Sequence, residues 1–163
     1  MIIGNIIAFI ASIIMVYTGY IKEKKKILYV QAIQIGLFVV SNIILGGITG
    51  AIINAISCVR NILCYKEKLN TLSKTILIIV SVVLSLKFND LGFIGLFPLI
   101  SSIIYILFMN IKDVIKFKYL IIFTMILWLC YDVYIGSYTS AIFNFACIVA
   151  NIISIIELKT KKA

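Results

Sequence analysis

The sequence predicts an all-α membrane protein with seven transmembrane helices, arranged as two three-helix repeats joined by one linker helix. Three observations lead to this fold class. The 163-residue chain is 63% hydrophobic, with a mean hydropathy of +1.19, whereas soluble domains are nearer half apolar. Its apolar runs are long, and a bilayer core of about 30 Å needs roughly 20 apolar residues per helix. Two segments far apart in the chain also share an unusual pattern of asparagines.

Seven helices follow from the apolar runs and the breaks between them. The run 27–59 would be about 50 Å long as a single helix, which is too long for a bilayer. Gly46-Gly47 divides it into a hairpin, and Gly136-Ser137 divides the last run in the same way. The expected helices cover residues 2–21, 27–45, 48–65, 72–88, 92–110, 117–135 and 138–157.

The lysines predict how these helices are oriented. Thirteen lysines lie at one set of alternating helix ends, and Lys87 alone lies at the other set. Because positively charged loops stay in the cytoplasm, we expect the N-terminus outside and the C-terminus in the cytoplasm. The net charge of +9 is explained by this topology, so no nucleic-acid partner is expected.

An internal repeat appears when the chain is shifted by 90 residues. Residues 48–63 then match residues 138–153 at seven of sixteen positions, where an isoleucine-rich composition would give about one or two by chance. Three helices per repeat would invert the second copy, and the fourth helix restores its direction. We therefore expect a first repeat at 1–65, a linker helix with its loops at 66–90, and a second repeat with a basic tail at 91–163.

Several classes of chemistry are disfavoured by the residues present. The chain has no histidine, no pair of intramembrane carboxylates and no glycine-rich phosphate loop, so we expect neither an enzyme nor a metal site or cofactor. The four cysteines lie inside apolar segments without a CxxC pair, which favours buried thiols. They are Cys58, Cys64, Cys130 and Cys147.

The polar residues inside the apolar segments are the candidate site. Two asparagines seven residues apart share one helical stripe, and this pattern occurs in both repeats. The residues are Asn54, Ser57 and Asn61 in the first repeat, and Asn144, Cys147 and Asn151 in the second. An unpaired amide is costly in an apolar medium, so these stripes should face the bundle interior.

Two interpretations of the asparagines remain open. Polar side chains can simply bond neighbouring helices together, each bond contributing roughly 0.6–2 kcal/mol. Alternatively, the outer pair, Asn54 and Asn144, holds a solute across the repeat axis, since an amide both donates and accepts hydrogen bonds. Ser57 and Cys147 would then belong to the same substrate site. The deeper pair, Asn61 and Asn151, would hold helices together or line an inner vestibule.

Three further residues are candidates for gating or coupling. Arg60, whose equivalent is Ala150, either extends to the cytoplasmic surface or acts as a gate or anion contact. Asp132 is either an exposed interfacial acid or the candidate for proton coupling. Pro98 lacks an N–H and crowds the preceding turn, which predicts a bend in the fifth helix near residues 95–98.

The chain also resembles a known family. The segments GAIINAI (50–56), GLFPLISSI (95–103) and WLCYDVYIGSYTSAIFN (128–144) are similar to YgjV-like bacterial inner membrane proteins, within the superfamily of SWEET and PQ-loop transporters. The resemblance implies a 3+1+3 plan with parallel repeats and a location in the bacterial inner membrane. In SWEET transporters, asparagines in the third and seventh helices face the substrate, and the matching residues here are Asn54 and Asn144.

This chain departs from the transporter pattern in two ways. Those transporters carry hinge prolines in both repeats, whereas here Pro98 is the only proline and its equivalent is Ala8. The proline–glutamine pair that names the PQ-loop is also missing. Both departures argue against a symmetric, proline-hinged movement.

We therefore expect a transporter or facilitator of a small, uncharged polar solute, similar to a sugar, nucleoside or vitamin, that works by alternating access. The alternative is a non-transporting membrane protein that acts through helix–helix interaction with a partner. The expected partners are a small-molecule solute and membrane lipid, and a homo-oligomer is left open.

Overall fold

The computed structural model describes residues 2–45, 48–88, 92–134 and 138–160, and this part of the chain is almost entirely helical. Its elements are α1 (Ile2–Tyr20), α2 (Lys24–Leu45), α3 (Ile48–Tyr65), α4 (Thr71–Phe88), the 3-10 turn η1 (Ile94–Leu96), α5 (Phe97–Phe108), α6 (Val114–Tyr134) and α7 (Tyr138–Thr160). The predicted all-helical class is thus confirmed. The breaks at Gly46-Gly47 and Gly136-Ser137 and the tail beyond Thr160 lie outside the described residues.

Five of these helices are long and apolar enough to cross a membrane, namely α1, α2, α4, α6 and α7. The apolar segments Ala51–Tyr65 and Ile94–Phe108 are shorter. The fifth helix differs most from its expected range of 92–110, because α5 has 12 residues and starts only at Phe97. At 1.5 Å per residue it is about 18 Å long.

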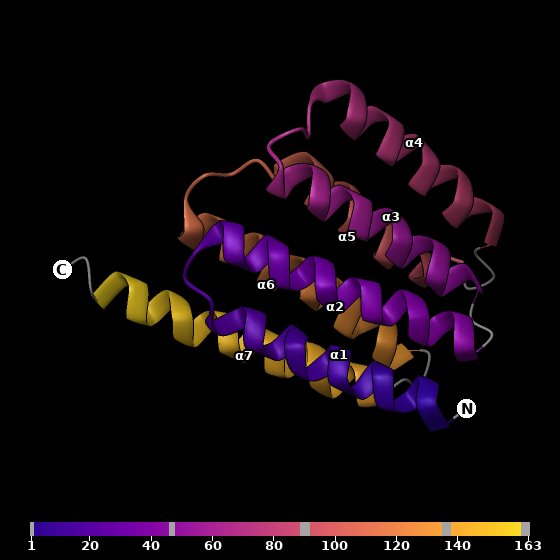
Figure 1. The fold of residues 1–163 in the computed structure, drawn as a ribbon, viewed down its shortest axis with the longest axis horizontal. Helices are drawn as coiled ribbons and strands as arrows, with labels where there is room; N and C mark the ends of the chain where they lie inside the picture. Colours follow the sequence, from indigo (N-terminus) through magenta and orange to yellow (C-terminus); the bar gives the residue numbers. More distant parts are fainter. Residues whose placement is uncertain (1, 46–47, 89–91, 135–137, 161–163) are drawn as a thin grey trace.

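The helices form two layers, which lie one behind the other in Figure 1, where the long axis of the molecule is horizontal. One layer contains α1, α2 and α3, here called the first half. The other contains α7, α6 and α5, the second half. Within each layer sequential helices pack together, and α1 and α7 also pack directly across the layers. α4 lies at the edge of the bundle, where it contacts α5 and α3.

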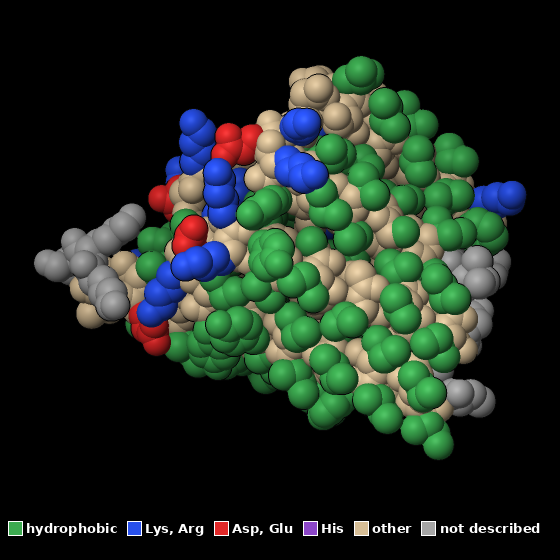
Figure 2. Space-filling view, viewed as in Figure 1, with side chains coloured by type: hydrophobic (Ala, Val, Ile, Leu, Met, Phe, Trp, Pro, Cys, Tyr) green, Lys and Arg blue, Asp and Glu red, His purple; other side chains and the backbone are tan. Residues whose placement is uncertain are grey.

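The surface is apolar along most of the bundle and charged at one end. Figure 2 shows hydrophobic side chains over the middle of one face and basic and acidic side chains near the end of α7. We call this the lysine end: α1, α3, α5 and α7 end here, and α2, α4 and α6 begin here. Large exposed side chains such as Ile6, Ile79 and Phe145 suit contact with lipid, since the bilayer interior is as apolar as they are.

A regular cap joins α3 to α4 at the lysine end. The Lys68 N–H donates to the Leu63 carbonyl and the Glu67 N–H to the Cys64 carbonyl, which is the Schellman pattern. Glu67 adopts the left-handed conformation with φ 58°. Its carboxylate pairs with Lys25 at 2.7 Å, and this hydrogen bond lowers the pKa of Glu67.

Candidate functional site

Four polar side chains meet where α2, α3 and α5 approach one another. The Gln31 Oε1 accepts a hydrogen bond from the Tyr105 hydroxyl at 2.8 Å and one from Asn61 Nδ2 at 3.3 Å. The Asn61 Oδ1 in turn accepts from Arg60 Nε at 3.2 Å. All four side chains are buried. We call them the inner network, and it joins the two halves because Tyr105 belongs to the second.

Arg60 is held inside the bundle, and it does not extend to the surface. Its side chain is only 7% exposed, and the guanidinium carbon lies 4.4 Å from the centre of the Tyr105 ring. Within the described residues no carboxylate pairs with Arg60, and its terminal nitrogens have no acceptor. The guanidinium is therefore stacked on the Tyr105 ring inside the bundle, and its terminal N–H groups are without an acceptor among the described residues.

The asparagine that lies 90 residues after Asn61 behaves differently. Asn151 is fully buried, yet its Nδ2 donates to the Cys147 carbonyl one turn back in the same helix, at 2.9 Å. Its Oδ1 has no hydrogen-bond partner within the described residues. The Cys147 thiol donates to the Met15 carbonyl of α1 at 3.5 Å. The Asn151 amide therefore does not bond α7 to another helix.

The outer asparagines differ as well. Asn144 is buried and donates from Nδ2 to Asp132 Oδ2 at 2.6 Å, so two predicted site residues lie together between α6 and α7. Asp132 is itself buried and is therefore not an exposed interfacial acid. Asn54 is half-buried and makes no equivalent side-chain hydrogen bond within the described residues. Under the 90-residue offset, Asp132 corresponds to Asn42, which is also half-buried.

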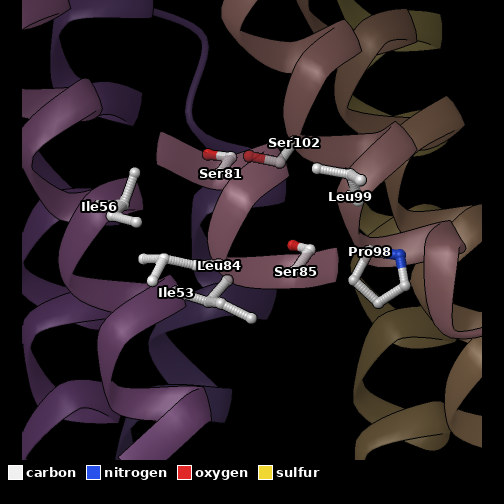
Figure 3. Close-up of a pocket in the computed structure, with 8 residues that line it drawn as sticks. All are labelled: Ile53, Ile56, Ser81, Leu84, Ser85, Pro98, Leu99 and Ser102. Carbon is white, nitrogen blue, oxygen red and sulfur yellow. The ribbon is translucent and has the colours of Figure 1, made fainter. Parts of the chain in front are cut away.

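A narrow pocket lies between α3, α4 and α5, and Figure 3 shows the residues around it. Ile53 and Ile56 come from α3, whereas α4 contributes Leu84 and two serines and α5 contributes Leu99, a serine and Pro98. The three hydroxyls belong to Ser81, Ser85 and Ser102, and we call this space the serine pocket. Half-buried Ser57, predicted as a site residue, is not among the lining residues.

Pro98 lines this pocket but does not bend a helix in its middle, so that expectation is corrected. Pro98 lies in the first turn of α5, directly after η1. A helix has no internal acceptor for the N–H groups of its first turn, so proline costs nothing there. Pro98 cannot donate to the Ile94 carbonyl, but this carbonyl accepts from the Phe97 N–H.

Two lysines connect the halves at the lysine end. Lys24 of α2 donates from Nζ to the Met109 and Ile111 carbonyls, at 2.5 and 2.6 Å, just after α5 ends. Lys118 of α6, fully buried, donates to the Gly19 carbonyl in the last turn of α1 at 2.8 Å. In both cases a cation meets the carbonyls at a helix C-terminus, where the helix dipole favours it.

The sequence interpretation missed Tyr105, Lys118 and the three pocket serines. Tyr105 follows Pro98 by seven residues, so the two share one stripe of α5, and this spacing could have drawn attention to it. Lys118 was treated only as a topological signal, because composition does not show that its ammonium turns inward. No sequence signal distinguishes the pocket serines from other helical serines.

A bundle of apolar helices with a buried polar interior defines a multi-pass helical membrane protein. Comparison with protein families gives the more specific result: the chain belongs to the bacterial inner membrane protein family Imp-YgjV, whose model matches residues 2–162. The comparisons with curated proteins and with solved structures give no match.

Proposed function

We propose that this inner membrane protein transports a small polar solute between its two halves. The observation that carries the proposal is the inner network, in which buried polar side chains of α2 and α3 meet Tyr105 of α5. Residues that line the serine pocket lie one helical turn before Arg60 and Tyr105, at Ile56 and Ser102. Polar groups inside a membrane bundle are costly and commonly mark a solute pathway. We further propose that the halves act as parallel repeats around this site, with the N-terminus outside.

The pocket should lie on the solute pathway, and chemical modification tests this. In a chain whose four cysteines are replaced by alanine, Ser102→Cys would react with a membrane-impermeant methanethiosulfonate, and solute flux into proteoliposomes would fall to background. The matched control is Ser12→Cys, 90 residues earlier, because the Ser12 hydroxyl bonds to its own helix at Ala8. Equal inhibition of both variants, or of neither, would contradict the pathway.

The asparagine clamp remains part of the proposal and needs its own test. Asn54→Leu combined with Asn144→Leu should abolish flux while the protein still folds, because leucine keeps the volume but removes the amides. Since Asn144 also bonds to Asp132, Asn144→Leu alone should lower stability as well. Asn54 has no such bond, so Asn54→Leu is the cleaner variant. Normal transport by the double variant would show that the two asparagines do not hold the solute.

The second candidate is a non-transporting protein that binds a partner within the membrane. It is favoured by the Asn61–Gln31 and Asn144–Asp132 bonds, which join neighbouring helices and need no solute to explain them. Absence of flux across a panel of sugars, nucleosides, vitamins and small organic acids would favour this candidate over transport.

A further inference from the structure

We propose that the groove between α2 and α3 binds one anionic phospholipid, with an acyl chain along the groove and the phosphate beside Lys66. This site is separate from the polar interior of the bundle, and it does not depend on whether the protein transports a solute. The proposal follows from the apolar lining of the groove, from its length within one leaflet, and from the lysine at its end.

The groove lies on the outer surface of two helices that pack side by side (Figure 1). Its volume is about 340 Å³, which is within the range of roughly 300–1,000 Å³ typical of ligand pockets. Half-buried Ala32 and Cys58 line its deeper part, and exposed Ile33 and Ile62 line its sides. The Cys58 thiol donates to the Ala32 carbonyl at 3.5 Å, so the two helices are bonded to each other beneath the groove.

The groove reaches the lysine end of the bundle. Tyr29 lies near the start of α2, Tyr65 is the last residue of α3, and Lys66 follows it; all three line the groove. The two tyrosine rings are exposed and their centres lie 5.9 Å apart. Tyrosine is typical of the level of the lipid headgroups. The groove therefore leads from the headgroup level into the apolar part of the membrane.

Lys66 provides a positive charge at the headgroup level. The acids near it are paired with other lysines. Glu67 pairs with Lys25 at 2.7 Å, in the α3–α4 cap. Glu23 pairs with Lys26 at 3.0 Å. Within the described residues Lys66 has no ion pair, and a lysine at the membrane surface attracts anionic lipids. A phospholipid with a net negative charge should therefore bind better than a zwitterionic one.

The length of the groove suits an acyl chain. Lys66 follows Cys58 by eight residues, which is about 12 Å at the helical rise of 1.5 Å per residue. One leaflet of the apolar core is about 15 Å thick, so a chain anchored at Lys66 would follow the groove through most of its leaflet. A helix of about 10 Å diameter would need roughly 900 Å³ over the same length, so it would lie across the groove without filling it.

The second half has larger side chains at the corresponding positions. Under the 90-residue offset, Ala32 corresponds to Ile122 and Cys58 to Ile148, while Lys66 corresponds to Ile156. Two isoleucines would occupy the deeper part of such a groove, and the cation at its end is replaced. We therefore expect the lipid site in the first half alone, and these residues supply the substitutions that test it.

Native mass spectrometry of the purified full-length chain measures the binding. In detergent, one dioleoyl phosphatidylglycerol should bind per chain, at a concentration about fivefold lower than that needed for dioleoyl phosphatidylethanolamine, because only the first carries a net negative charge. Glycerol phosphate has the charge without the acyl chains and should not bind. Equal binding of the two lipids, or equally strong binding of glycerol phosphate, would overturn the lipid assignment.

Charge variants connect the headgroup preference to the groove. Lys66→Gln should weaken phosphatidylglycerol binding about fivefold and leave phosphatidylethanolamine binding unchanged. The matched control is Lys116→Gln, which removes an exposed lysine at the same end of the bundle but outside the groove, and it should bind both lipids normally. Equal losses in the two variants would show that the charge of the whole lysine end attracts the lipid, which would refute the site.

Variants that fill the groove test the acyl chain. Ala32→Ile and Cys58→Ile should each weaken the binding of both lipids at least fivefold, and either variant is sufficient if the other does not fold. The control is Val59→Ile, which enlarges an exposed neighbour of Cys58 outside the groove lining and should have no effect. Lipid-free dimers that Ala32→Ile dissociates would assign the groove to a second copy of the chain and overturn the proposal.

Discussion

The α1–α7 and α3–α5 interfaces correspond to each other under the 90-residue offset, but they are built differently. In the first, Gly19 of α1 lies against α7, and a Cβ at Gly19 would lie only 2.6 Å from the Ala150 Cβ. In the second, the equivalent residues are Met109 and Arg60. There α3 and α5 meet through side chains, without close backbone approach.

The same offset shows why one asparagine pattern has two outcomes. Where glycine and alanine let α1 and α7 touch, Asn151 is enclosed and bonds to its own helix. Asn61 instead bonds to Gln31 of α2, whereas the equivalent residue of α6 is Ile121, whose side chain has no acceptor. The residues available on the neighbouring helices, and not the asparagine spacing, determine whether the amide becomes part of a polar site.

The variant with the largest expected effect disrupts the close α1–α7 interface. Gly19→Ala should lower the free energy of unfolding by about 1–3 kcal/mol, because the new methyl group forces α1 and α7 apart. The control is Gly36→Ala in α2, where an added Cβ meets nothing within 4 Å, and where alanine should stabilise the helix by up to about 1 kcal/mol. Unfolding in mixed micelles measures both. If Gly19→Ala leaves the free energy of unfolding unchanged, close approach of the helices is not what distinguishes this interface.

The second prediction compares the two deep asparagines directly. Asn61→Ala should lower the free energy of unfolding by about 1–2 kcal/mol, because it removes the bond to Gln31 and the acceptor of a buried guanidinium. Asn151→Ala should cost less than half of that, since its Oδ1 is already without a partner within the described residues. Equal losses in the same unfolding assay would mean that the two amides are equivalent.

The third prediction concerns the link between the halves at Tyr105. Tyr105→Phe keeps the ring beneath Arg60 but removes the 2.8 Å bond to Gln31, so it should cost about 0.5–1.5 kcal/mol. The exposed Tyr119, whose hydroxyl accepts from Lys159, provides the control, and Tyr119→Phe should leave the unfolding midpoint unchanged. If Tyr105→Phe leaves the free energy of unfolding unchanged, the ring alone holds the network.

The smallest effect is expected outside both interfaces, at the α3–α4 cap. Glu67→Gly should raise the melting temperature by about 2–4 °C, because glycine adopts the left-handed conformation without strain. Glu67→Gln keeps the backbone strain and should leave the melting temperature at pH 7 nearly unchanged, since exposed ion pairs contribute little.

The same residue gives a weak pH dependence. Because Lys25 lowers the Glu67 pKa, the pair contributes stability at neutral pH that is lost as the pH falls through that lowered pKa. The Glu67→Gln variant should therefore lose slightly less stability than the parent chain below pH 4. If the variant loses more stability than the parent chain at low pH, the Lys25–Glu67 pair does not stabilise the protein in the way proposed.

The helical class and most helix ranges were predictable because hydrophobic length and lysine-rich loops are local signals. The predicted starts of α2 and α6 were each three residues late, at 27 and 117, because charges were taken as boundaries although lysine is a good helix former. Pro98 was misread for a related reason. A proline is equally compatible with a kink and with a helix start, and only the structure shows which.

The side-chain partners could not be predicted, because they depend on how helices distant in sequence come together. Gln31 and Tyr105 are 74 residues apart, and nothing local to either residue indicates the other. Asp132 and Asn144 were both selected from the sequence, but their bond was not. The 3+1+3 plan with parallel repeats and the orientation of the termini remain predictions.

The lysine bonds have a mechanical consequence. Within the described chain, most hydrogen bonds that join the halves lie toward the lysine end, where Lys24, Lys118 and Tyr105 donate across. The Cys147 thiol adds a bond to the Met15 carbonyl from the middle of α7. Toward the other end, the Ser41–Gly4 and Asn144–Asp132 bonds stay inside one half, and an edge-to-face ring contact between Phe9 and Phe143 spans the halves instead. The two halves are therefore joined more firmly at the lysine end than at the opposite end. A rocking movement would pivot about the lysines, and its largest displacement would occur at the far end.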